Sequence, residues 1–189
     1  MIQDNFPKQN YKENVFITGV GSRTVPPKAT QTIYDLVYLL NAYYDIVWRS
    51  GAANGSDSAF ELYANHKEIF LPWEQFNNSS SQLYLKNLSK EKIKTAQTIL
   101  SEIRNIKAMK ATVLNFHTRN VFQVFGQDLE TPSECVICYT DDGAEHHTEV
   151  TFNTGGTGTA IKLASLYNIP VFNIKNQQSI SNLLKYLNI

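Results

Sequence analysis

The sequence alternates short apolar runs with longer segments of helical periodicity, and this alternation constrains the fold more than any other feature. The apolar runs are four to six residues long and comprise Val15–Val20, Asp45–Arg49, Glu68–Leu71, Cys135–Tyr139 and Pro170–Ile174. Short apolar runs bounded by glycine, proline or polar loops are typical of strands buried in a parallel sheet. Their alternation with helices predicts an α/β fold, a Rossmann-like parallel sheet of about five strands with helices on both faces.

The segments between these runs repeat apolar residues at helical spacing. We expect helices at Pro27–Tyr43, Ser89–Met109, Ala111–Phe125 and Ile180–Leu187, and two more that begin beyond Gly55 and near Thr157. Ser89 is the expected N-cap of its helix, because a serine hydroxyl can accept a hydrogen bond from a free N–H of the first turn. Gly126 is expected to end the helix that precedes it.

Length, charge and hydropathy limit the class of protein. A chain of 189 residues suits one domain with a substantial core, so we expect a single domain over residues 14–189. Residues 1–13 are mostly polar and contain Pro7, so we expect a flexible leader there. Its 17 basic and 17 acidic residues balance, so nucleic acid is not an expected partner. No apolar run reaches the roughly 20 residues of a membrane span, and the N-terminus lacks an apolar signal segment. We therefore expect a cytoplasmic protein with no membrane partner.

Cys135 and Cys138 form a C-x-x-C pattern inside an expected strand. Successive residues of a strand alternate between the two faces, so these two side chains should point in opposite directions. The sequence therefore favours neither a redox pair nor a shared metal ion.

A glycine- and threonine-rich stretch, N-T-G-G-T-G-T-A-I-K-L-A, runs from Asn153 to Ala164. Glycines let the backbone approach a ligand closely, and the helix that follows directs free N–H groups and a positive dipole end toward the same place. This combination is typical of a phosphate site, although an ordinary glycine-rich turn before a helix has the same composition. Lys162 falls inside the helix, so the stretch is not a Walker loop.

Three loops rich in small or polar residues should meet at one edge of the sheet. They span residues 19–24, 50–57 and 140–157, and each follows an expected strand. In parallel α/β sheets, the loops after the strands gather at the carboxyl edge, where ligands bind. The sequence therefore predicts a ligand site built from these three loops.

The first two loops carry groups suited to a nucleotide. Backbone N–H groups at Gly19 and Gly21, with the Ser22 hydroxyl, suit an anionic oxygen, and Arg23 can add a bidentate phosphate contact or remain a solvated loop arginine. In the second loop, Asp57 can either cap a helix or accept a ribose hydroxyl. Glu61 lies one helical turn further on the same face.

Two other segments supply further candidates. Arg119, Asn120 and Gln123 are spaced so that they form a polar edge on an otherwise apolar helix. The loop after the fourth strand contains the acids and histidines Asp141, Asp142, Glu145, His146, His147 and Glu149. Its spacing does not favour metal chelation, and a pH-dependent ligand contact is the preferred interpretation.

With these loops in hand, the chain resembles the SLOG superfamily, which includes the DprA/Smf DNA-processing proteins and the LOG nucleotide phosphoribohydrolases. The resemblance rests on five motifs in order, from about Val15 onward: 19–23 (G-V-G-S-R), 49–61 (R-S-G-A-A-N-G-S-D-S-A-F-E), 71–73 (L-P-W), 119–126 (R-N-V-F-Q-V-F-G) and 155–160 (G-G-T-G-T-A). It is most similar to small stand-alone DprA-like proteins of phages.

This resemblance and the chemistry above imply a set of ligand- or phosphate-binding residues: Gly19, Gly21, Ser22, Arg23, Ser50, Gly51, Gly55, Asp57, Arg119, Asn120, Gln123, Thr154, Gly155, Gly156, Thr157, Gly158 and Thr159. Glu61, Asp142, His147 and Glu149 are candidates for further ligand contacts. No metal and no cofactor is expected.

The resemblance also bears on catalysis. LOG hydrolases follow their glycine-rich stretch with two glutamates, and here those positions hold Ile161 and Lys162. Isoleucine cannot stabilise the oxocarbenium-like state of ribose-bond cleavage, so the sequence favours binding over hydrolysis, although Glu61, Asp142 or Glu149 could substitute.

Our hypothesis from the sequence is a phage anti-defence sponge that sequesters an ADP-ribose-derived immune signal in the host cytoplasm. The resemblance also implies a homo-oligomer. The alternatives are a nucleotide hydrolase, a DprA-like protein that binds single-stranded DNA, or a plain interaction protein.

Overall fold

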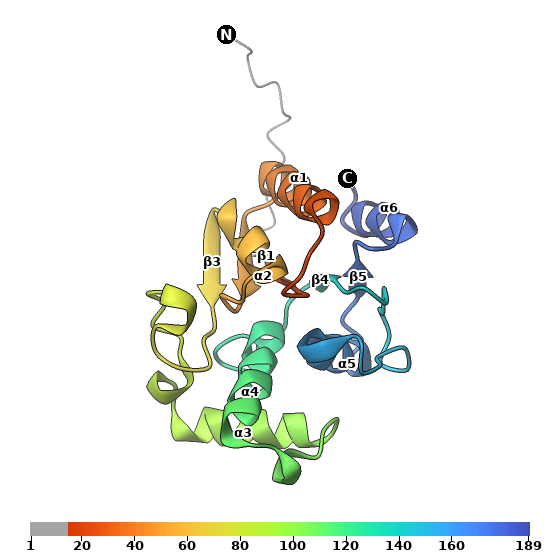
Figure 1. Ribbon diagram of the computed structural model, residues 1–189. Coiled ribbons are helices and arrows are strands. Elements are labelled where there is room, and N and C mark those ends of the chain that lie inside the picture. Colours follow the sequence, from red (N-terminus) through yellow and green to blue (C-terminus); the bar gives the residue numbers. More distant parts are fainter. Residues whose placement is uncertain (1–14) are drawn as a thin grey trace.

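The computed structural model describes residues 15–189, and these contain a five-stranded, all-parallel sheet in the order β3-β2-β1-β4-β5 (Figure 1). The strands are β1 (Val15–Gly21), β2 (Ile46–Ser50), β3 (His66–Ile69), β4 (Cys135–Tyr139) and β5 (Val171–Asn173). The predicted fold class, a Rossmann-like parallel sheet with helices on both faces, is confirmed. The leader expected over residues 1–13 lies outside the described residues.

Strand β1 lies at the centre of the sheet and pairs with β2 on one side and β4 on the other. Its Ile17 is in register with Trp48 of β2 and Cys135 of β4. The chain adds β2 and β3 on one side of β1, then crosses to add β4 and β5 on the other. The loops that leave β1 and β4 therefore diverge, and such a switch point opens a crevice at the carboxyl edge of the sheet.

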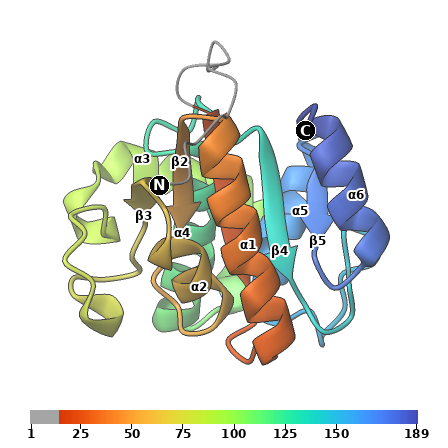
Figure 2. The same cartoon turned by 90° about the horizontal axis from the view of Figure 1, so that it is seen from above.

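One face of the sheet is covered by α1 (Pro27–Tyr43), α2 (Ser56–Leu62) and α6 (Gln177–Tyr186). Figure 2 shows these three helices on the near side of the strands. The predicted helix Pro27–Tyr43 is confirmed at both ends. Its apolar stripe packs with Trp48 of β2 and Phe60 of α2, whose rings stack with centroids 5.7 Å apart.

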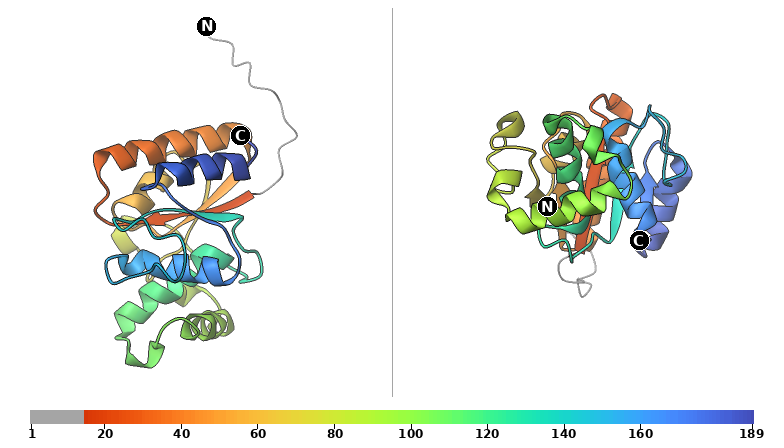
Figure 3. Two further views of the ribbon diagram at one scale, coloured as in Figure 1. Left: turned by 90° about the vertical axis from the view of Figure 1, so that its right-hand side faces the viewer. Right: turned by 90° about the horizontal axis from the view of Figure 1, so that it is seen from below.

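The opposite face is covered by α4 (Ala111–Phe125) and α5 (Gly158–Leu166), and α3 (Lys90–Ser101) packs outside α4 (Figure 3). Val121 and Phe122 of α4 are completely buried against the sheet. The predicted bounds of α4 are confirmed, because Gly126 adopts φ +78° and ends the helix there.

The two cysteines of β4 lie on opposite faces, as predicted. Cys135 packs with the α1 side of the core and Cys138 with the α4 side. Both thiols are free and buried, and burial raises the pKa of each thiol. A buried, protonated thiol is a poor nucleophile and a poor metal ligand.

The structure corrects some predicted bounds. The helix expected over Ser89–Met109 ends at Ser101, and a separate 3₁₀ turn follows at Ile106–Ala108. Ile99, Ile103 and Ile106 all pack against the core, so apolar periodicity continues where the helix does not. Ser89 is the N-cap, since its hydroxyl accepts a hydrogen bond from the N–H of Lys92 at 3.2 Å.

Other bounds also shift: β1 ends at Gly21 rather than Val20, β2 spans Ile46–Ser50 rather than Asp45–Arg49, and β5 spans Val171–Asn173 rather than Pro170–Ile174. The third strand is His66–Ile69 rather than Glu68–Leu71, and Leu71 instead forms an isolated bridge with Tyr84. The last helix begins at Gln177, three residues before the predicted start at Ile180. Within residues 15–189, no helix is long and apolar enough to cross a membrane.

Candidate functional site

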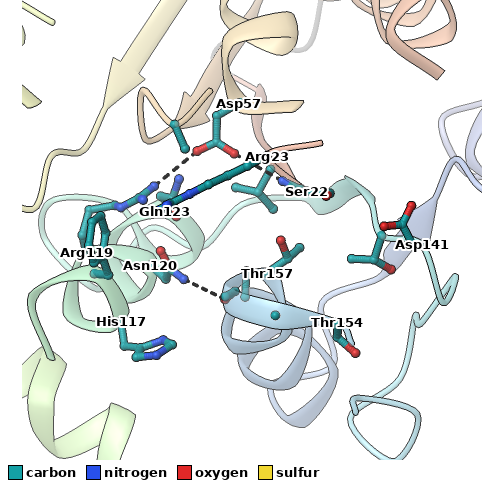
Figure 4. Close-up of a pocket in the computed structure, with 18 of the residues that line it drawn as sticks. Ser22, Arg23, Asp57, His117, Arg119, Asn120, Gln123, Asp141, Thr154 and Thr157 are labelled. Carbon is teal, nitrogen blue, oxygen red and sulfur yellow. Dashed lines mark hydrogen bonds and ion pairs between the residues drawn. The ribbon is translucent and has the colours of Figure 1, made fainter. Parts of the chain in front are cut away.

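A cavity of about 300 Å³ opens at the carboxyl edge of β1 and β4 and is called the site pocket below. Its walls come from the loops after β1, β2 and β4 and from one side of α4 (Figure 4). The lining residues are Val20, Gly21, Ser22, Arg23, Ala53, Asp57, Phe116, His117, Arg119, Asn120, Gln123, Thr140, Asp141, Asn153, Thr154, Gly155, Gly156, Thr157 and Ala160. The three predicted loops therefore meet in one place, and α4 joins them.

A buried ion pair joins the end of β1 to α2 and α4. Asp57 accepts a hydrogen bond from the N–H of Gly21 at 3.2 Å with one carboxylate oxygen and one from Arg119 Nη1 at 3.3 Å with the other. Burial raises the pKa of the Asp57 carboxyl, and the charge of Arg119 opposes that rise. Burial lowers the pKa of Arg119, and Asp57 opposes that fall.

The structure therefore contradicts the capping role considered for Asp57. The N-cap of α2 is Gly55, which makes no side-chain cap, and Asp57 lies inside the first turn with its carboxylate directed at Gly21 and Arg119. Gly55 adopts φ +87°, and a Cβ there would come within 2.5 Å of the backbone oxygens of Ser22 and Arg23. Only glycine suits this position.

Gly51 provides the space for the Arg119 guanidinium. A Cβ at Gly51 would lie 1.4 Å from Arg119 Nη1 and 2.6 Å from Gln123 Nε2. The second loop thus packs against α4 at Arg119 and Gln123 through a residue that does not line the pocket. Arg119, Asn120 and Gln123, which the sequence places together, all line the pocket. Gly51 has a structural reason to be glycine, whatever binds in the pocket.

Two buried nitrogens at this wall have no hydrogen-bond partner in the described part of the chain. They are Arg119 Nε and Gln123 Nε2, and Gln123 is only 1% exposed. A buried donor without a partner costs about 1–3 kcal/mol, so such a group usually meets water or a ligand. Gln123 lines the site pocket, but its Nε2 is buried on the side of Gly51, where a Cβ would come within 2.6 Å of it.

The glycine-rich stretch forms the opposite wall. Gly155–Thr157 is a 3₁₀ turn that leads directly into α5, and nothing lies within 4 Å of a Cβ placed on Gly155 or Gly156. Asn120 of α4 donates a hydrogen bond to the carbonyl of Gly156 at 3.1 Å. The Gly155–Gly156 turn before α5 therefore faces open space.

The segment before this turn is hydrogen-bonded to the carboxylate of Asp142. Thr151 and Thr154 each donate a hydroxyl hydrogen bond to the same carboxylate oxygen of Asp142, at 3.1 and 2.5 Å. Thr154 lines the pocket, whereas Asp142 supports it. These hydrogen bonds lower the pKa of the Asp142 carboxyl against the effect of its burial, so it is a fixed anion.

Arg23 is the exposed cation at the mouth of the pocket. Its guanidinium lies 5.4 Å from the centroid of the Phe116 ring, and Phe116 in turn contacts Trp73 edge-on at 5.1 Å. A cation over an aromatic face is weakly held. Arg23 is therefore well placed to turn toward an anionic ligand.

A hydrogen-bonded cluster joins α4 to the first turn of α5. Thr159 Oγ1 lies 2.7 Å from His117 Nδ1 and accepts a hydrogen bond from Arg104 Nε at 2.8 Å. Burial, together with the charges of Arg104 and Arg119, lowers the pKa of His117 to about 4. His117 is thus a neutral side chain of the pocket wall at neutral pH.

Eleven of the seventeen predicted binding residues line the site pocket, and six lie behind its wall. Those behind the wall are Gly19, Ser50, Gly51, Gly55, Gly158 and Thr159. Gly19 faces the Phe60 ring of α2, and the Ser50 hydroxyl reaches the carbonyl of Asp57 at 3.5 Å. These residues shape the pocket rather than line it.

The four further candidates are not on the lining either. Glu61 accepts a hydrogen bond from the N–H of Ala52 at 2.8 Å and faces a different cavity. His147 contacts Ser165 of α5, and Glu149 accepts hydrogen bonds from the N–H groups of residues 145 and 146, which lower its pKa. Among residues 15–189, no group of three or more His, Cys, Asp or Glu side chains could hold a metal ion.

The predicted set of binding residues omits eight lining residues, namely Val20, Ala53, Phe116, His117, Thr140, Asp141, Asn153 and Ala160, of which Asp141 was considered as part of the acid- and histidine-rich loop. Phe116 lies one turn before Arg119 on α4 and His117 one turn before Asn120, so the i, i+3 spacing that joins Asn120 to Gln123 also joins His117 to Asn120. That spacing was the available signal for His117. Ile161 of α5 is completely buried in the core.

No protein-family model matches this chain, and no curated protein matches it in sequence. Its fold is similar to a solved structure of DNA processing protein A from Helicobacter pylori, which was described for its unique single-stranded DNA binding mode. The TM-score is 0.51 at 18% sequence identity, over 90% of this chain and 72% of that chain. At this level of identity, the likeness shows a fold shared with that protein.

Proposed function

We propose that this chain is a nucleotide-binding protein that holds one phosphate-bearing nucleotide unit in the site pocket and does not cleave it. The observation that carries the proposal is the pairing of two features across one cavity: the polar edge of Arg119, Asn120 and Gln123 on α4, and the open Gly155–Gly156 turn before α5. The first feature offers hydrogen-bonding groups to a sugar or base, and the second suits an anion.

In this proposal, each wall has a separate part. The phosphate lies at the Gly155–Thr157 turn before α5, where the positive end of the helix dipole favours negative charge, and Arg23 closes on it from the mouth. Gln123 and Asn120 contact the sugar or base, and the partly exposed Phe116 ring offers an apolar surface to the base.

The carboxylates of the pocket support binding without cleavage. Cleaving a ribose bond requires a carboxylate that is free to act on the sugar. Asp57 is occupied by Arg119 and Gly21, and Asp141 accepts a hydrogen bond from the Tyr139 hydroxyl at 2.9 Å. At the position of the first LOG glutamate, Ile161 is in the core.

Single-stranded DNA is the source of the nucleotide unit that the fold likeness favours. The similar structure binds single-stranded DNA, and a pocket for one nucleotide with an aromatic ring at its side suits a strand with an unstacked base. Because basic and acidic residues balance at 17 each, we expect few phosphate contacts and a modest dependence of affinity on salt. Nucleic acid, which composition alone disfavours, is therefore included as a proposed partner.

An ADP-ribose-derived signal is the second candidate. It is favoured by the size of the cavity, about 300 Å³, which lies at the lower end of small-molecule sites, and by the absence of net positive charge. A protein that bound such a signal tightly without cleaving it would act as a sponge and could serve a phage against host defence. The same pocket residues would be used in both cases.

The test measures binding and fate of the ligand together. The protein is titrated with fluorescent oligodeoxythymidylate by anisotropy, and with ADP-ribose and cyclic ADP-ribose by calorimetry. Each mixture is then heat-denatured, and the ligand is examined by mass spectrometry. Recovery of intact ligand supports the proposal, and the ligand that binds more tightly identifies the source. Recovery of a cleaved product would show an enzyme instead.

A matched pair of variants ties binding to the pocket. Arg23→Gln removes the cation at the mouth, and Lys28→Gln removes an exposed cation on the first turn of α1, outside the pocket. We expect the first variant to weaken binding about tenfold and the second to leave it unchanged. Equal binding by both variants would place the ligand elsewhere.

A further inference from the structure

The His117 imidazole forms its one recorded hydrogen bond within residues 15–189 with Thr159, a residue that is itself completely buried. The bond uses Nδ1, so the second ring nitrogen, Nε2, is left for the site pocket that His117 lines. Figure 4 shows the ring below Asn120 and beside the start of α5. Which nitrogen carries the proton therefore decides whether the pocket meets a donor or an acceptor.

The hydrogen bonds of this cluster determine which ring nitrogen of His117 carries the hydrogen. Thr159 Oγ1 accepts from Arg104 Nε at 2.8 Å and has one hydroxyl proton of its own to donate. His117 Nδ1, at 2.7 Å, is the acceptor that the described residues offer for that proton. If Nδ1 carried a hydrogen instead, the Thr159 proton would be buried without an acceptor, which is unfavourable. Nδ1 therefore accepts, and Nε2 carries the hydrogen.

The surrounding charges keep the ring neutral. Arg104, in the segment after α3, and Arg119 on α4 both disfavour an imidazolium, and burial acts in the same direction. From α5, the neighbouring side chain is the uncharged Thr159. The remaining charged groups of the pocket are Arg23, Asp57 and Asp141, and Asp57 is already engaged by Arg119.

We propose that His117 is a ligand-binding residue that presents a neutral Nε2–H donor to a phosphate oxygen held at the start of α5, and that Thr159 and Arg104 are positioning residues that fix this tautomer. The proposal rests on the function proposed above and adds a specificity to it. The pocket recognises an acceptor atom at this point, and it does so without a titration step over the physiological pH range.

The tautomer is tested on the free protein by long-range ¹H–¹⁵N NMR of the histidine rings, with His117 assigned from the spectrum of His117→Gln. We expect the Nε2–H pattern at pH 7, and its loss in Thr159→Val, which keeps the shape but removes the hydroxyl. Thr159→Ser should restore it. An Nδ1–H pattern, or an imidazolium at pH 7, would overturn the proposal.

The ligand contact is tested with two neutral substitutions in the full chain. His117→Gln can place an N–H near the position of Nε2, whereas His117→Asn offers its oxygen to Thr159 but does not reach the pocket. With oligodeoxythymidylate and ADP-ribose as probes, we expect affinity within about threefold of wild type for Gln and about tenfold lower for Asn, which loses one hydrogen bond to the ligand.

The outcomes separate this inference from the proposed function. Wild-type binding with equal affinities for both variants refutes the role of His117 but leaves nucleotide binding in place. Wild-type protein that binds neither probe refutes the proposed function and the ligand contact together. A selective loss in His117→Asn, with thermal stability like that of His117→Gln, supports both.

Discussion

The Asp57 carboxylate lies 3.3 Å from Arg119 Nη1, and the two side chains are only 4% and 6% exposed. One residue belongs to α2 and the other to α4, so the pair joins helices from opposite faces of the sheet at its carboxyl edge. Burial opposes the charge of each partner, and their mutual attraction compensates for part of that effect. A buried pair of this kind fixes geometry more than it adds stability.

Breaking this pair from one side should strongly destabilise the protein. In Asp57→Asn, the Arg119 charge stays buried without its partner, and we expect the free energy of unfolding to fall by about 3 kcal/mol. Arg119→Gln should cost a similar amount. The double variant should lose less than the sum of the two, because no charge is then left uncompensated. Urea unfolding followed by circular dichroism measures all three, with the exposed helix residue Asp35→Asn as a control that changes little.

Two glycines of the site should respond in opposite ways to alanine. At Gly51, the new Cβ would overlap Arg119 Nη1 at 1.4 Å, so Gly51→Ala must displace the guanidinium and lower the unfolding temperature. At Gly156, nothing lies within 4 Å, so Gly156→Ala should leave the unfolding temperature unchanged but reduce nucleotide affinity about tenfold. Thermal melts and titrations of the same preparations test this. Unchanged affinity in Gly156→Ala would show that the phosphate is not at this turn.

Much of the fold could be predicted because local and long-range signals agree. β4 and α4 have the predicted bounds, since a run buried on both faces and a glycine with positive φ are readable without knowledge of the tertiary structure. The end of α3 could not be predicted. Ile103 and Ile106 continue the apolar spacing beyond Ser101, and only their packing shows that the segment is not helical.

The site was predictable where it depends on loops and less so where it depends on contacts. Gly21, Arg23 and Gly156 follow strands or begin a helix, and the parallel topology brings them together. By contrast, Gly51 was expected to contact the ligand and instead accommodates Arg119. His117 has an ordinary place in a helix sequence, and its role depends on Thr159, 42 residues away. Partners that are distant in sequence leave no local pattern.

Acidification should destabilise the protein through His117. Its pKa is lowered to about 4 from 6.5, so between these values the unfolded chain binds more protons than the folded one, and stability falls as pH decreases from 6.5 toward 4. Allowing for partial exposure, the contribution is roughly 2 kcal/mol. His117→Gln cannot titrate, so its loss of stability over this range should be smaller by that amount. Parallel curves of unfolding free energy against pH for the two proteins would contradict the shift.

Arg23 should affect binding and its salt dependence but not folding. Its side chain is exposed and contacts the Phe116 ring, so Arg23→Gln should leave the unfolding free energy within about 0.5 kcal/mol of wild type. If its guanidinium meets one phosphate of single-stranded DNA, the slope of log affinity against log salt should fall in magnitude by about 0.7. Anisotropy titrations with oligodeoxythymidylate at several salt concentrations measure this slope, with Lys28→Gln as the charge-matched control. An unchanged slope of log affinity against log salt in Arg23→Gln would mean that the phosphates of the strand do not reach the mouth of the pocket. The ADP-ribose-type ligand would then become the favoured source of the bound nucleotide.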